Sequence, residues 1–349
     1  CHALSLIGNN VTLVSRGSNV LKDQSLSSKN IYKYYNVKPI FKIKQHFSFF
    51  PFIKVSLLIS LFKSFFFVYP KHYDLIYGRD LQLCYLLAFF GKEVVLEIHQ
   101  PIDDLGLINK FFFNSLISNA RCKKIVLITE ALSSWYGEKY GKFASKFYVA
   151  ADGADPIDCN IQKNTSRISL GYVGHFYKGK GLEIISKLPE IYPNLDFYIV
   201  GGIGKDFNYW QEKIGWLDNV HMPGYLNQKK VQEYLCRFDI ALAPFQNRIN
   251  PHGNATNISQ WTSPLKIFEY MSSESAIITS NLNVIKEILD DDVNCIMCQS
   301  DSLEDWTNAI DKLVDNQKLR LLLAKNAKDK FLKNYTWKAR ACNIINEIY

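Results

Sequence analysis

Residues 262–289, TSPLKIFEYMSSESAIITSNLNVIKEIL, constrain the fold of this chain more than any other stretch. Pro264 is compatible with a first helical turn, where its missing N–H costs nothing. Leu265, Phe268 and Met271 then recur at the spacing of one buried helix face. A serine-rich break and a short β-branched run follow, and such a run is typical of a buried parallel strand. The stretch therefore predicts a loop, a helix, a turn and a buried strand in that order.

The same alternation of strand-like runs and helical segments extends over most of the chain. The predicted strands are 11–15, 73–77, 93–98, 124–129, 147–150, 168–173, 197–200, 219–222, 239–243, 276–280 and 295–297. The predicted helices are 81–90, 105–120, 130–140, 181–190, 205–215, 228–236, 264–273, 283–289 and 303–313. This order predicts an α/β fold with parallel, doubly wound sheets.

The 349 residues exceed one ordinary core, so we expect two domains. Residues 1–150 are assigned to an N-terminal Rossmann-like domain and 168–334 to a C-terminal one. Residues 151–167 are polar and aperiodic, which is typical of a linker. The first ten residues read as the end of a helix with a glycine stop. A Rossmann half has a strand and a glycine-rich turn before such a helix, so we expect that first strand to be missing from this sequence.

The predicted helix start at Ser263 is a candidate anion site. Free N–H groups and the helix dipole both favour a phosphate there, and Lys266 in the first turn adds a positive charge. Glu269, one turn later, is suited to accept hydrogen bonds from a sugar diol. A phosphate pocket beside a diol acceptor describes a nucleotide-sugar site. On the pattern alone, a helix whose Lys266 and Glu269 are merely solvated is an equal alternative.

The sequence PLKIFEYM followed by SAIITSNLNVIKEIL resembles the donor-binding signature of bacterial GT-B glycosyltransferases, the retaining kind grouped as family 4. The resemblance implies two Rossmann-like domains that face each other across a cleft, with a last helix, 335–349, that crosses back to the first domain. It implies that Glu269 holds the ribose hydroxyls. The family often has a second glutamate eight positions earlier, where this chain has Trp261. Its role is then lost, or is taken by backbone amides around Ser263, Pro264 and Leu265.

A second element of the resemblance is the glycine-rich turn GYVGHFYKGKG at 171–181. Glycines such as Gly174 let the backbone approach a ligand, and lysines such as Lys178 match a pyrophosphate. The turn lacks the GxGxxG spacing of NAD sites and the GK[ST] of a P-loop. It resembles the family element in which a basic residue follows the glycine, here His175, and a lysine precedes the next glycine, here Lys180. Lys180 and the lysine at the helix start would then stabilise the departing nucleoside diphosphate.

The N-terminal domain offers a histidine at the carboxyl end of a predicted strand, the edge where open α/β sheets bind ligands. His99, in EIHQP, resembles the family histidine that faces the donor sugar. The alternative is a histidine that caps the strand end through a backbone hydrogen bond. Arg79 and Asp80 occupy the analogous edge one unit earlier and are weaker candidates for acceptor contacts.

Three further segments resemble loops of the family. Gly201 with its neighbouring glycine, and the stretch that contains Tyr225 and Leu226, resemble the loops that flank the nucleobase. Residues 149–155 resemble the turn at the domain junction, with a structural role. Residues 246–260 are polar and Asn-rich, and we expect a mobile lid over the donor sugar.

The charge of the chain is concentrated in its N-terminal half. Residues 1–150 contain 19 Lys/Arg and 9 Asp/Glu, hence +10, and the remainder contains 22 and 24, hence −2. The most apolar stretch, 47–68, contains Pro51, Lys54 and Lys63, so it is not expected to span a membrane. Phenylalanines mixed with lysines suit a membrane interface, and the alternative is an ordinary core helix. No recognisable RNA or DNA module carries these basic residues, so we expect an anionic membrane surface and no nucleic acid.

The eight cysteines are scattered, which suggests a reduced cytosolic protein rather than a disulfide scaffold. Cys295 and Cys298 form one CxxC without a second ligand pair, and we interpret them as buried in a short strand. No DxD-like acidic pair occurs where a divalent metal is expected, and Asp290–Asp292 reads as a solvated turn. We therefore expect an enzyme that uses no metal and no cofactor other than its donor substrate.

Together these features predict a retaining glycosyltransferase that moves a hexose from a nucleotide-diphosphate sugar to a hydroxyl of a glycan or lipid-linked acceptor. The setting implied is bacterial surface polysaccharide assembly, in the cytoplasm and peripheral on the inner face of the plasma membrane. Two alternatives remain open: a non-catalytic GT-B subunit that scaffolds a membrane glycosylation complex, and a sugar-nucleotide epimerase of GT-B shape.

Overall fold

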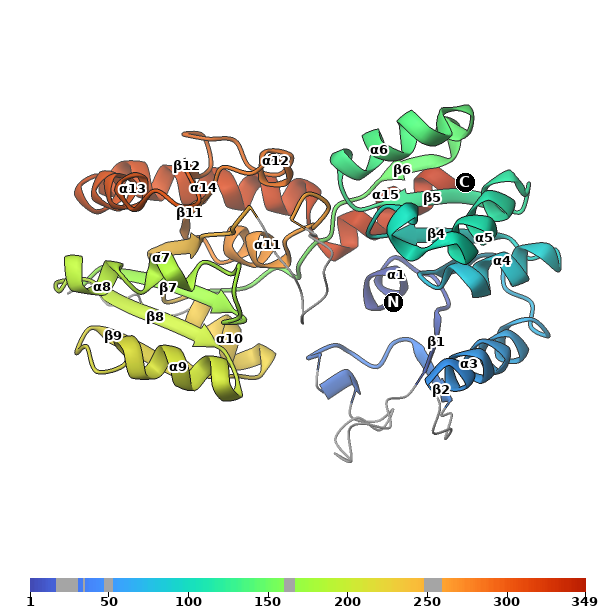
Figure 1. Ribbon diagram of the computed structural model, residues 1–349, viewed down its shortest axis with the longest axis horizontal. Coiled ribbons are helices and arrows are strands. Elements are labelled where there is room, and N and C mark those ends of the chain that lie inside the picture. Colours follow the sequence, from blue (N-terminus) through green and yellow to red (C-terminus); the bar gives the residue numbers. More distant parts are fainter. Residues whose placement is uncertain (17–30, 34, 47–52, 160–166, 248–258) are drawn as a thin grey trace. The chain divides into compact units, whose positions relative to one another are not determined.

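The computed structural model describes residues 1–16, 31–33, 35–46, 53–159, 167–247 and 259–349 (Figure 1). The chain forms two compact units. The first contains Cys1–Ala151 and Arg340–Tyr349, and the second contains Asp152–Ala339. Of the predicted linker 151–167, Ala151 belongs to the first unit, and the described residues from Asp152 onward belong to the second, where the Asp152 N–H donates to Ser263 Oγ at 2.9 Å.

The first unit is built on parallel strands. Its strands are β1 (Thr12–Arg16), β2 (Lys42–His46), β3 (Ile76–Gly78), β4 (Val94–Ile98), β5 (Cys122–Leu127) and β6 (Phe147–Val149). Its helices are α1 (His2–Leu6), α3 (Ile53–Val68), α4 (Leu81–Phe89), the 3-10 helix η2 (Ile102–Leu105), α5 (Leu107–Ser118), α6 (Glu130–Tyr140), the 3-10 helix η3 (Gly141–Lys146) and most of α15 (Trp337–Ile348). Strands β3-β4-β5-β6 form one sheet and β1-β2 another. Every strand of the larger sheet is connected through a helix, as parallel pairing requires.

Strand β4 lies in the middle of the first unit, and all five of its residues are buried. Val95 on this strand packs with Val126, Ala150 and Ile344, so the end of the chain covers this sheet. A strand that is buried on both faces is expected to be continuously apolar, and the single charged residue of β4, Glu97, stands out for that reason.

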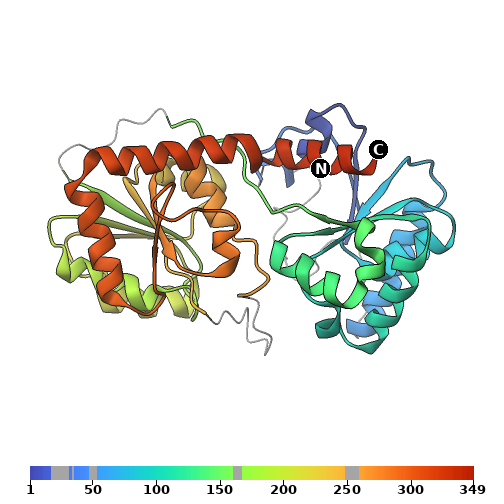
Figure 2. The same ribbon diagram turned by 90° about the horizontal axis from the view of Figure 1, so that it is seen from above.

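The second unit contains one six-stranded parallel sheet in the order β12-β11-β10-β7-β8-β9. Its strands are β7 (Ser169–Gly174), β8 (Asp196–Gly201), β9 (Val220–Gly224), β10 (Ile240–Ala243), β11 (Ala276–Ser280) and β12 (Ile296–Cys298). Its helices are α7 (Leu182–Ile185), α8 (Leu188–Ile191), α9 (Gly204–Ile214), α10 (Gln228–Leu235), α11 (Leu265–Ser272), α12 (Asn283–Lys286), α13 (Leu303–Asp315) and α14 (Gln317–Asn334). Helix α14 is the long red helix along one side of this unit in Figure 2.

Alternate residues of the second sheet point to opposite faces, which places helices on both sides. Leu170 and Tyr172 of β7 share a buried cluster with residues of α7, α8, α9 and α13. Gly171, between them, faces the other way, where a Cβ atom would lie about 2.1 Å from the ring of Phe238 after α10.

The chain order reverses beside β7, because β8 lies on one side of it and β10 on the other. Such switch points are where open α/β sheets bind ligands, at the carboxyl ends of the strands.

Several sequence predictions need correction. The predicted buried face of α11 is confirmed at Phe268 and Met271 and wrong at Leu265, which is 50% exposed because it begins the helix at the open edge of the sheet. The helix also buries Ile267, Tyr270 and Ser272. The predicted helix 181–190 is two short helices, α7 and α8. Helix α14 was not predicted, since its buried face includes Arg320 and two alanines and its apolar stripe is weak.

The cysteine prediction is partly wrong. Cys159 and Cys236 form a disulfide, because the start of the second unit packs against the end of α10 and brings their Cα atoms to 5.2 Å. The other six cysteines are free. Cys295 and Cys298 are buried at 0% and 2% exposure, with Cys298 at the end of the short strand β12, as predicted. No helix in the described part of the chain is long and apolar enough to cross a membrane.

Candidate functional site

The site is built where the strands of the second sheet end. Strand β7 ends at Gly174, β8 at Gly201 and β9 at Gly224. The Gly202 N–H donates to the Gly174 carbonyl at 3.3 Å, so two of these loops touch through their backbones. A Cβ atom on Gly201 would lie 2.0 Å from that carbonyl oxygen, and the φ of Gly201 is +119°. Only glycine allows this approach, and the result is a backbone-lined edge beside the start of α11.

Lys266 points from the first turn of α11 into this edge. Its Nζ atom lies 3.8 Å from the centre of the Tyr172 ring and 5.2 Å from that of Phe245. A Cβ atom on Gly174 would lie 3.0 Å from it. The Nζ atom is buried and has no hydrogen-bond partner among the described residues. Burial lowers the pKa of Lys266 well below its ordinary value, the charge of Lys180 adds to this, and Glu269 opposes it. A buried ammonium group without a partner is a destabilising arrangement that an anion would relieve.

Lys180 lies at the end of the glycine-rich turn and is the second cation of the site. Its Nζ atom is 5.2 Å from the centre of the Tyr177 ring, and burial lowers the pKa of Lys180. The next residue, Gly181, has φ +82°, and a Cβ atom there would lie 1.9 Å from the Pro244 carbonyl. The turn is therefore held against the end of β10. Burial lowers the pKa of both lysines, and the charge of Lys180 further lowers that of Lys266, so this edge is suited to bind negative charge.

Two buried tyrosines, Tyr172 and Tyr270, fix the shape of this edge, and neither is among the predicted site residues. The Tyr172 hydroxyl donates to the His175 carbonyl at 2.7 Å, which holds the glycine-rich turn. The Tyr270 hydroxyl accepts from the Val173 N–H at 2.8 Å and donates to the Leu242 carbonyl at 3.3 Å. Tyr270 belongs to α11, so it connects the helix start to strands β7 and β10. Burial raises the pKa of both phenols, which keeps them neutral donors.

Glu269 lies one turn after Lys266 on α11. Burial raises the pKa of Glu269, while a hydrogen bond from Gln228 and the charge of Lys266 lower it. The bond from Gln228 Nε2 to Glu269 Oε1 is 3.2 Å long. Gln228 begins α10, directly after the N-cap Asn227, and was not among the predicted residues. The carboxylate is thus oriented by one neutral donor and retains acceptor capacity for a diol.

The other predicted residues of the second unit surround these groups. Ser263 is buried and uses its hydroxyl to accept the Asp152 N–H, so its side chain has a structural role. Pro264 is the N-cap of α11, and Leu265 follows it. Tyr225 is 61% exposed and, with Leu226, follows β9. Of the predicted lid, residues 248–258 lie outside the described part of the chain.

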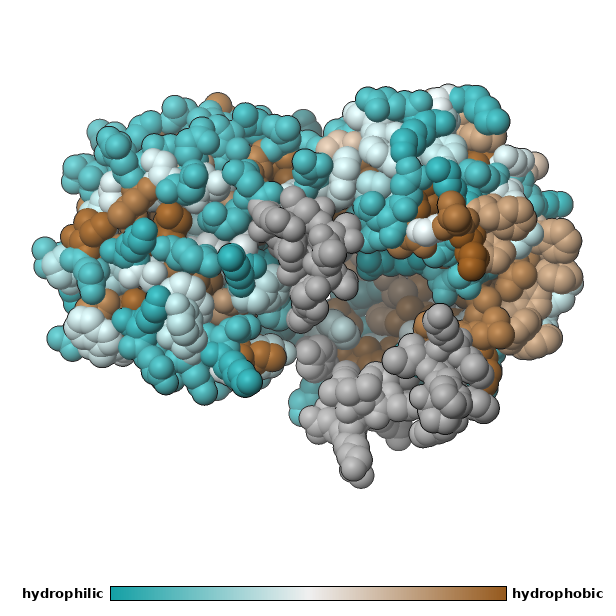
Figure 3. All heavy atoms as spheres, in the orientation of Figure 1, coloured by the Kyte–Doolittle hydropathy of each residue, from teal (hydrophilic) through white to brown (hydrophobic). Residues whose placement is uncertain are grey.

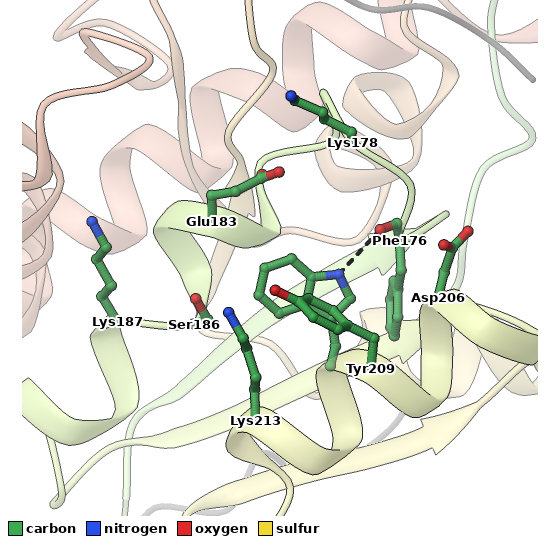
Figure 4. A pocket seen from close by; sticks show the side chains of 9 residues that line it. Phe176, Lys178, Glu183, Ser186, Lys187, Asp206, Tyr209 and Lys213 are labelled. Atoms are coloured by element: carbon green, nitrogen blue, oxygen red, sulfur yellow. Dashed lines mark hydrogen bonds between the residues drawn. The ribbon is translucent and has the colours of Figure 1, made fainter. Parts of the chain in front are cut away.

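A separate hollow of about 370 Å³ lies between α9 and the segment from α7 to Lys187. Figure 4 shows the side chains that line it. Lys178 lines it, together with Lys187 and Lys213, whereas His175, Lys180, Lys266 and Glu269 do not. Its floor supports the glycine-rich turn, because the indole of Trp210 donates to the Phe176 carbonyl at 3.2 Å. A Cβ atom on Gly202 would lie 2.3 Å from the Phe176 ring. The hollow therefore lies on the side of the glycine-rich turn that is away from Lys180 and Lys266, and Lys178 belongs to that side.

In the first unit, His99 follows β4 and belongs to a charged network. Its Nε2 atom is 2.7 Å from Glu97 Oε1, and its Nδ1 atom is 3.1 Å from Arg79 Nη2. A guanidinium group can only donate, so Nδ1 accepts and Nε2 carries the proton that Glu97 accepts. The histidine is thereby held as one tautomer. It is not the backbone cap that was the alternative explanation.

Glu97 is the centre of this network and is 7% exposed. Arg340 of α15 donates to its Oε2 atom at 2.8 Å and to the carbonyls of Ala151 and Ala150 at 2.8 and 3.2 Å; the Tyr77 hydroxyl also donates to Glu97. Burial alone would raise the pKa of Glu97, but the hydrogen bond from His99 and the charge of Arg340 hold it well below its ordinary value. No local sequence pattern indicates Arg340, which lies 243 residues from Glu97 along the chain.

Arg79 and Asp80, the predicted acceptor residues, have different surroundings. The side chain of Arg79 is 66% exposed and bonds to His99. Asp80 is the N-cap of α4 and accepts the Leu83 N–H at 3.0 Å, which is a structural role.

The three acids at 290–292 form a turn in which Asp290 and Asp292 pair with Lys330 and Lys312, each at 2.6 Å. No group of three His, Cys, Asp or Glu side chains in the described ranges could hold a metal ion.

Comparison with known proteins bears on the fold of the chain. Residues 167–316 match a family described as Glycosyl transferases group 1. The structure is similar to a glycosyltransferase from Rickettsia africae, with a TM-score of 0.72 at 14% identity over 99% of this chain and 91% of that one. It is also similar to Anabaena HepE in complex with UDP-glucose, with a TM-score of 0.65 at 13% identity over 91% of this chain and 87% of that one.

The chain has the GT-B fold. The predicted fold class is therefore confirmed, with parallel α/β sheets in two units. An uncharacterized glycosyltransferase of Methanocaldococcus jannaschii is 27% identical over 261 residues, which are 72% of this chain. The match spans 60% of the length of that relative. The glycosyltransferase match at 167–316 lies within the second unit of this GT-B protein, which contains the lysines and Glu269 of the site.

Proposed function

We propose that this GT-B protein is a glycosyltransferase that transfers a hexose from a nucleotide-diphosphate sugar to an acceptor hydroxyl with retention of configuration. The observation that carries the proposal is the buried Nζ atom of Lys266, which has no hydrogen-bond partner among the described residues and lies at the start of α11. A cation held in this way requires an anion to compensate its burial. The phosphates of a nucleoside diphosphate supply that charge, and a helix start is suited to bind them.

The donor would be held by three kinds of contact. Lys180, Lys266 and the first N–H groups of α11 would bind the diphosphate, and Glu269 would accept hydrogen bonds from the ribose diol. The loops after β8 and β9, at Gly201 and Tyr225, would flank the base. HepE contains UDP-glucose, which makes uridine diphosphate the first nucleotide to test.

The reaction breaks the bond between the anomeric carbon and the β-phosphate oxygen, and it forms a bond from that carbon to the acceptor oxygen. The acceptor proton leaves with the departing diphosphate. Negative charge grows on the leaving phosphate, where the two lysines and the helix dipole would stabilise it without a metal ion. Retention requires attack on the face of the leaving group, and we propose that His99, fixed by Glu97 and Arg79, orients the donor sugar.

For the acceptor, we propose a glycan or a lipid-linked glycan in bacterial surface polysaccharide assembly. The support is the charge of residues 1–150, which is +10. A basic surface favours the anionic headgroups of a membrane, so the protein would act in the cytoplasm on the inner face of the plasma membrane.

A thermal-shift panel tests the donor site. The wild-type protein, Glu269→Ala and the matched control Glu233→Ala, an exposed glutamate of α10, are each heated with UDP, GDP, ADP, CMP and dTDP. We expect one diphosphate to stabilise the wild type and the control but not Glu269→Ala, since binding to the folded state raises the transition temperature. The stabilising nucleotide then identifies the nucleotide part of the donor. NMR of the product anomer tests retention.

The same panel separates the alternatives. If no nucleotide shifts the wild-type transition, the proposal fails and the scaffold subunit becomes the better explanation. If a nucleotide binds and the nucleotide sugar is converted to an epimer without an acceptor, the epimerase is the better explanation.

A further inference from the structure

Helix α3 has large apolar residues on its outer face as well as on its inner face. The inner face buries Phe65 and Val68, which are 8% and 6% exposed, together with Ser60 at 8%. Ser64 Oγ lies 2.6 Å from Nε2 of His46 on β2, itself 4% exposed. The outer face carries Phe62 and Phe66, which are 50% and 66% exposed. A helix at a water-facing surface keeps its apolar stripe on the core and has polar residues on the opposite face. The outer face of α3 is therefore suited to an apolar environment.

The apolar surface continues over α4 and α5 through a series of ring contacts. Ring centres are 5.3 Å apart for Phe65 and Phe90, and 5.3 Å for Phe90 and Phe89. Tyr85 then connects Phe89, at 6.3 Å, to Phe112 of α5, at 5.0 Å. Figure 3 shows the resulting hydrophobic area over these helices.

We call the exposed part of this surface the aromatic ridge. It consists of Phe62, Phe66, Phe89, Phe90, Leu107 and Phe111. The exposed fractions of the last four are 66%, 49%, 86% and 61%. A patch that extends over three helices is larger than scattered surface residues explain, and it indicates an interaction site.

The charges of the segment that contains α3 favour a lipid bilayer over a second protein surface. Residues 53–73 contain three lysines and no acid. Lys92 lies beside the ridge, with its Nζ atom 5.4 Å from the centre of the Tyr69 ring. The aliphatic part of the lysine and the tyrosine ring are apolar, and the ammonium group adds a positive charge beside them. Aromatic and aliphatic side chains mixed with lysines are typical of surfaces that lie at the boundary between headgroups and acyl chains. A second copy of this chain would instead bring equal positive charges together.

We propose that the aromatic ridge inserts into the interfacial region of an anionic lipid bilayer. This deepens the proposed function, on which it rests for the membrane setting, and specifies which helices contact the lipid and how. The apolar side chains would supply most of the attachment, and the surrounding lysines would favour anionic headgroups. Attachment of this kind is less sensitive to salt than electrostatic adsorption, because apolar burial is not screened.

Vesicle co-sedimentation with the chain of residues 1–349 tests the proposal. The lipids are phosphatidylcholine alone or mixed with phosphatidylglycerol, at low salt and at about 0.5 M salt, where charges are screened within a few ångströms. The test variant is Phe66→Ser/Phe89→Ser/Phe111→Ser. The matched control is Ile203→Ser/Trp216→Ser/Leu321→Ser, three exposed apolar residues of the second unit with 64%, 67% and 60% exposure.

We expect the wild type and the control to bind the anionic vesicles and to retain most of that binding at high salt. The triple phenylalanine variant should bind at least about tenfold more weakly, since three large side chains no longer enter the interface. Its UDP-induced thermal shift should remain equal to that of the wild type. This second measurement reports on folding and on the donor site, so failure of the ridge and failure of the proposed function are distinguishable.

Three outcomes would overturn the proposal. The first is wild-type protein that stays in the supernatant with both vesicle types. The second is a phenylalanine variant that binds as the wild type does. The third is a dimer of the wild type in sedimentation equilibrium, together with a monomeric phenylalanine variant. The ridge would then be the contact between two copies of this chain.

Discussion

Replacement of Lys266 by methionine should stabilise the second unit and weaken nucleotide binding. The Nζ atom of Lys266 is buried, and none of the residues that the structure describes accepts a hydrogen bond from it. Uncompensated burial of such a cation costs several kcal/mol. The contact with the Tyr172 ring, at 3.8 Å, recovers about 2 kcal/mol of this. Methionine keeps the length and the ring contact without the charge.

The magnitude follows from the difference between these two contributions. The free energy of unfolding of the unliganded second unit should increase by about 1–2 kcal/mol. For a unit of this size, each kcal/mol raises the transition temperature by about 2–4 °C, so the shift should be about 2–8 °C. Nucleotide affinity should fall by about 30- to 150-fold, which corresponds to the loss of about 2–3 kcal/mol from a charge-assisted contact.

Scanning calorimetry with and without UDP measures both effects on one sample. Lys318→Met, at an exposed position in the first turn of α14, is the matched control and should change neither quantity. The reasoning is refuted if Lys266→Met lowers the transition temperature while UDP still stabilises the variant. That result would mean that the ammonium group stabilises the unliganded fold and that nucleotide binding does not depend on Lys266.

Three further predictions follow from charges and thiols. Arg340→Ala should lower the free energy of unfolding of the first unit by about 3–5 kcal/mol in urea titrations at neutral pH, since Glu97 is left buried without its 2.8 Å partner. The pKa of Glu97 in the folded state is below its unfolded value of about 4.3. The stability that Glu97 contributes is therefore complete above about pH 4.3 and is lost as the pH falls towards the folded-state pKa. Over this range the free energy of unfolding of Arg340→Ala should decline less than that of the wild type. UDP binding should take up protons at alkaline pH, because an anion raises the lowered pKa of Lys266; calorimetry in two buffers measures this, and Lys266→Met should show none. Alkylation of unfolded, unreduced protein should modify six of the eight cysteines, with Cys159 and Cys236 unmodified, as read by mass spectrometry.

Local patterns in the sequence determined the order and type of most elements. The predicted strand 276–280 and helix 130–140 coincide with β11 and α6. Periodicity is a local property, so a run of β-branched residues or an N-cap threonine identifies its element without knowledge of the remaining chain. The spacing of Lys266 and Glu269, one turn apart on α11, is also local, and the structure places both on that helix at the carboxyl edge of the sheet.

The environment of each functional group was decided by residues that are distant in sequence. Tyr172 and Phe245 enclose the Lys266 amine, and Arg340 reaches Glu97 across 243 residues. The aromatic ridge exists because three helices align their outer faces, whereas the sequence indicated only the first of them. Hydrophobic pattern fixes which residues form an element and gives a first indication of its buried side. Burial of a particular atom, and with it the pKa and the need for a partner, depends on which elements pack together, and that is decided only by the tertiary structure.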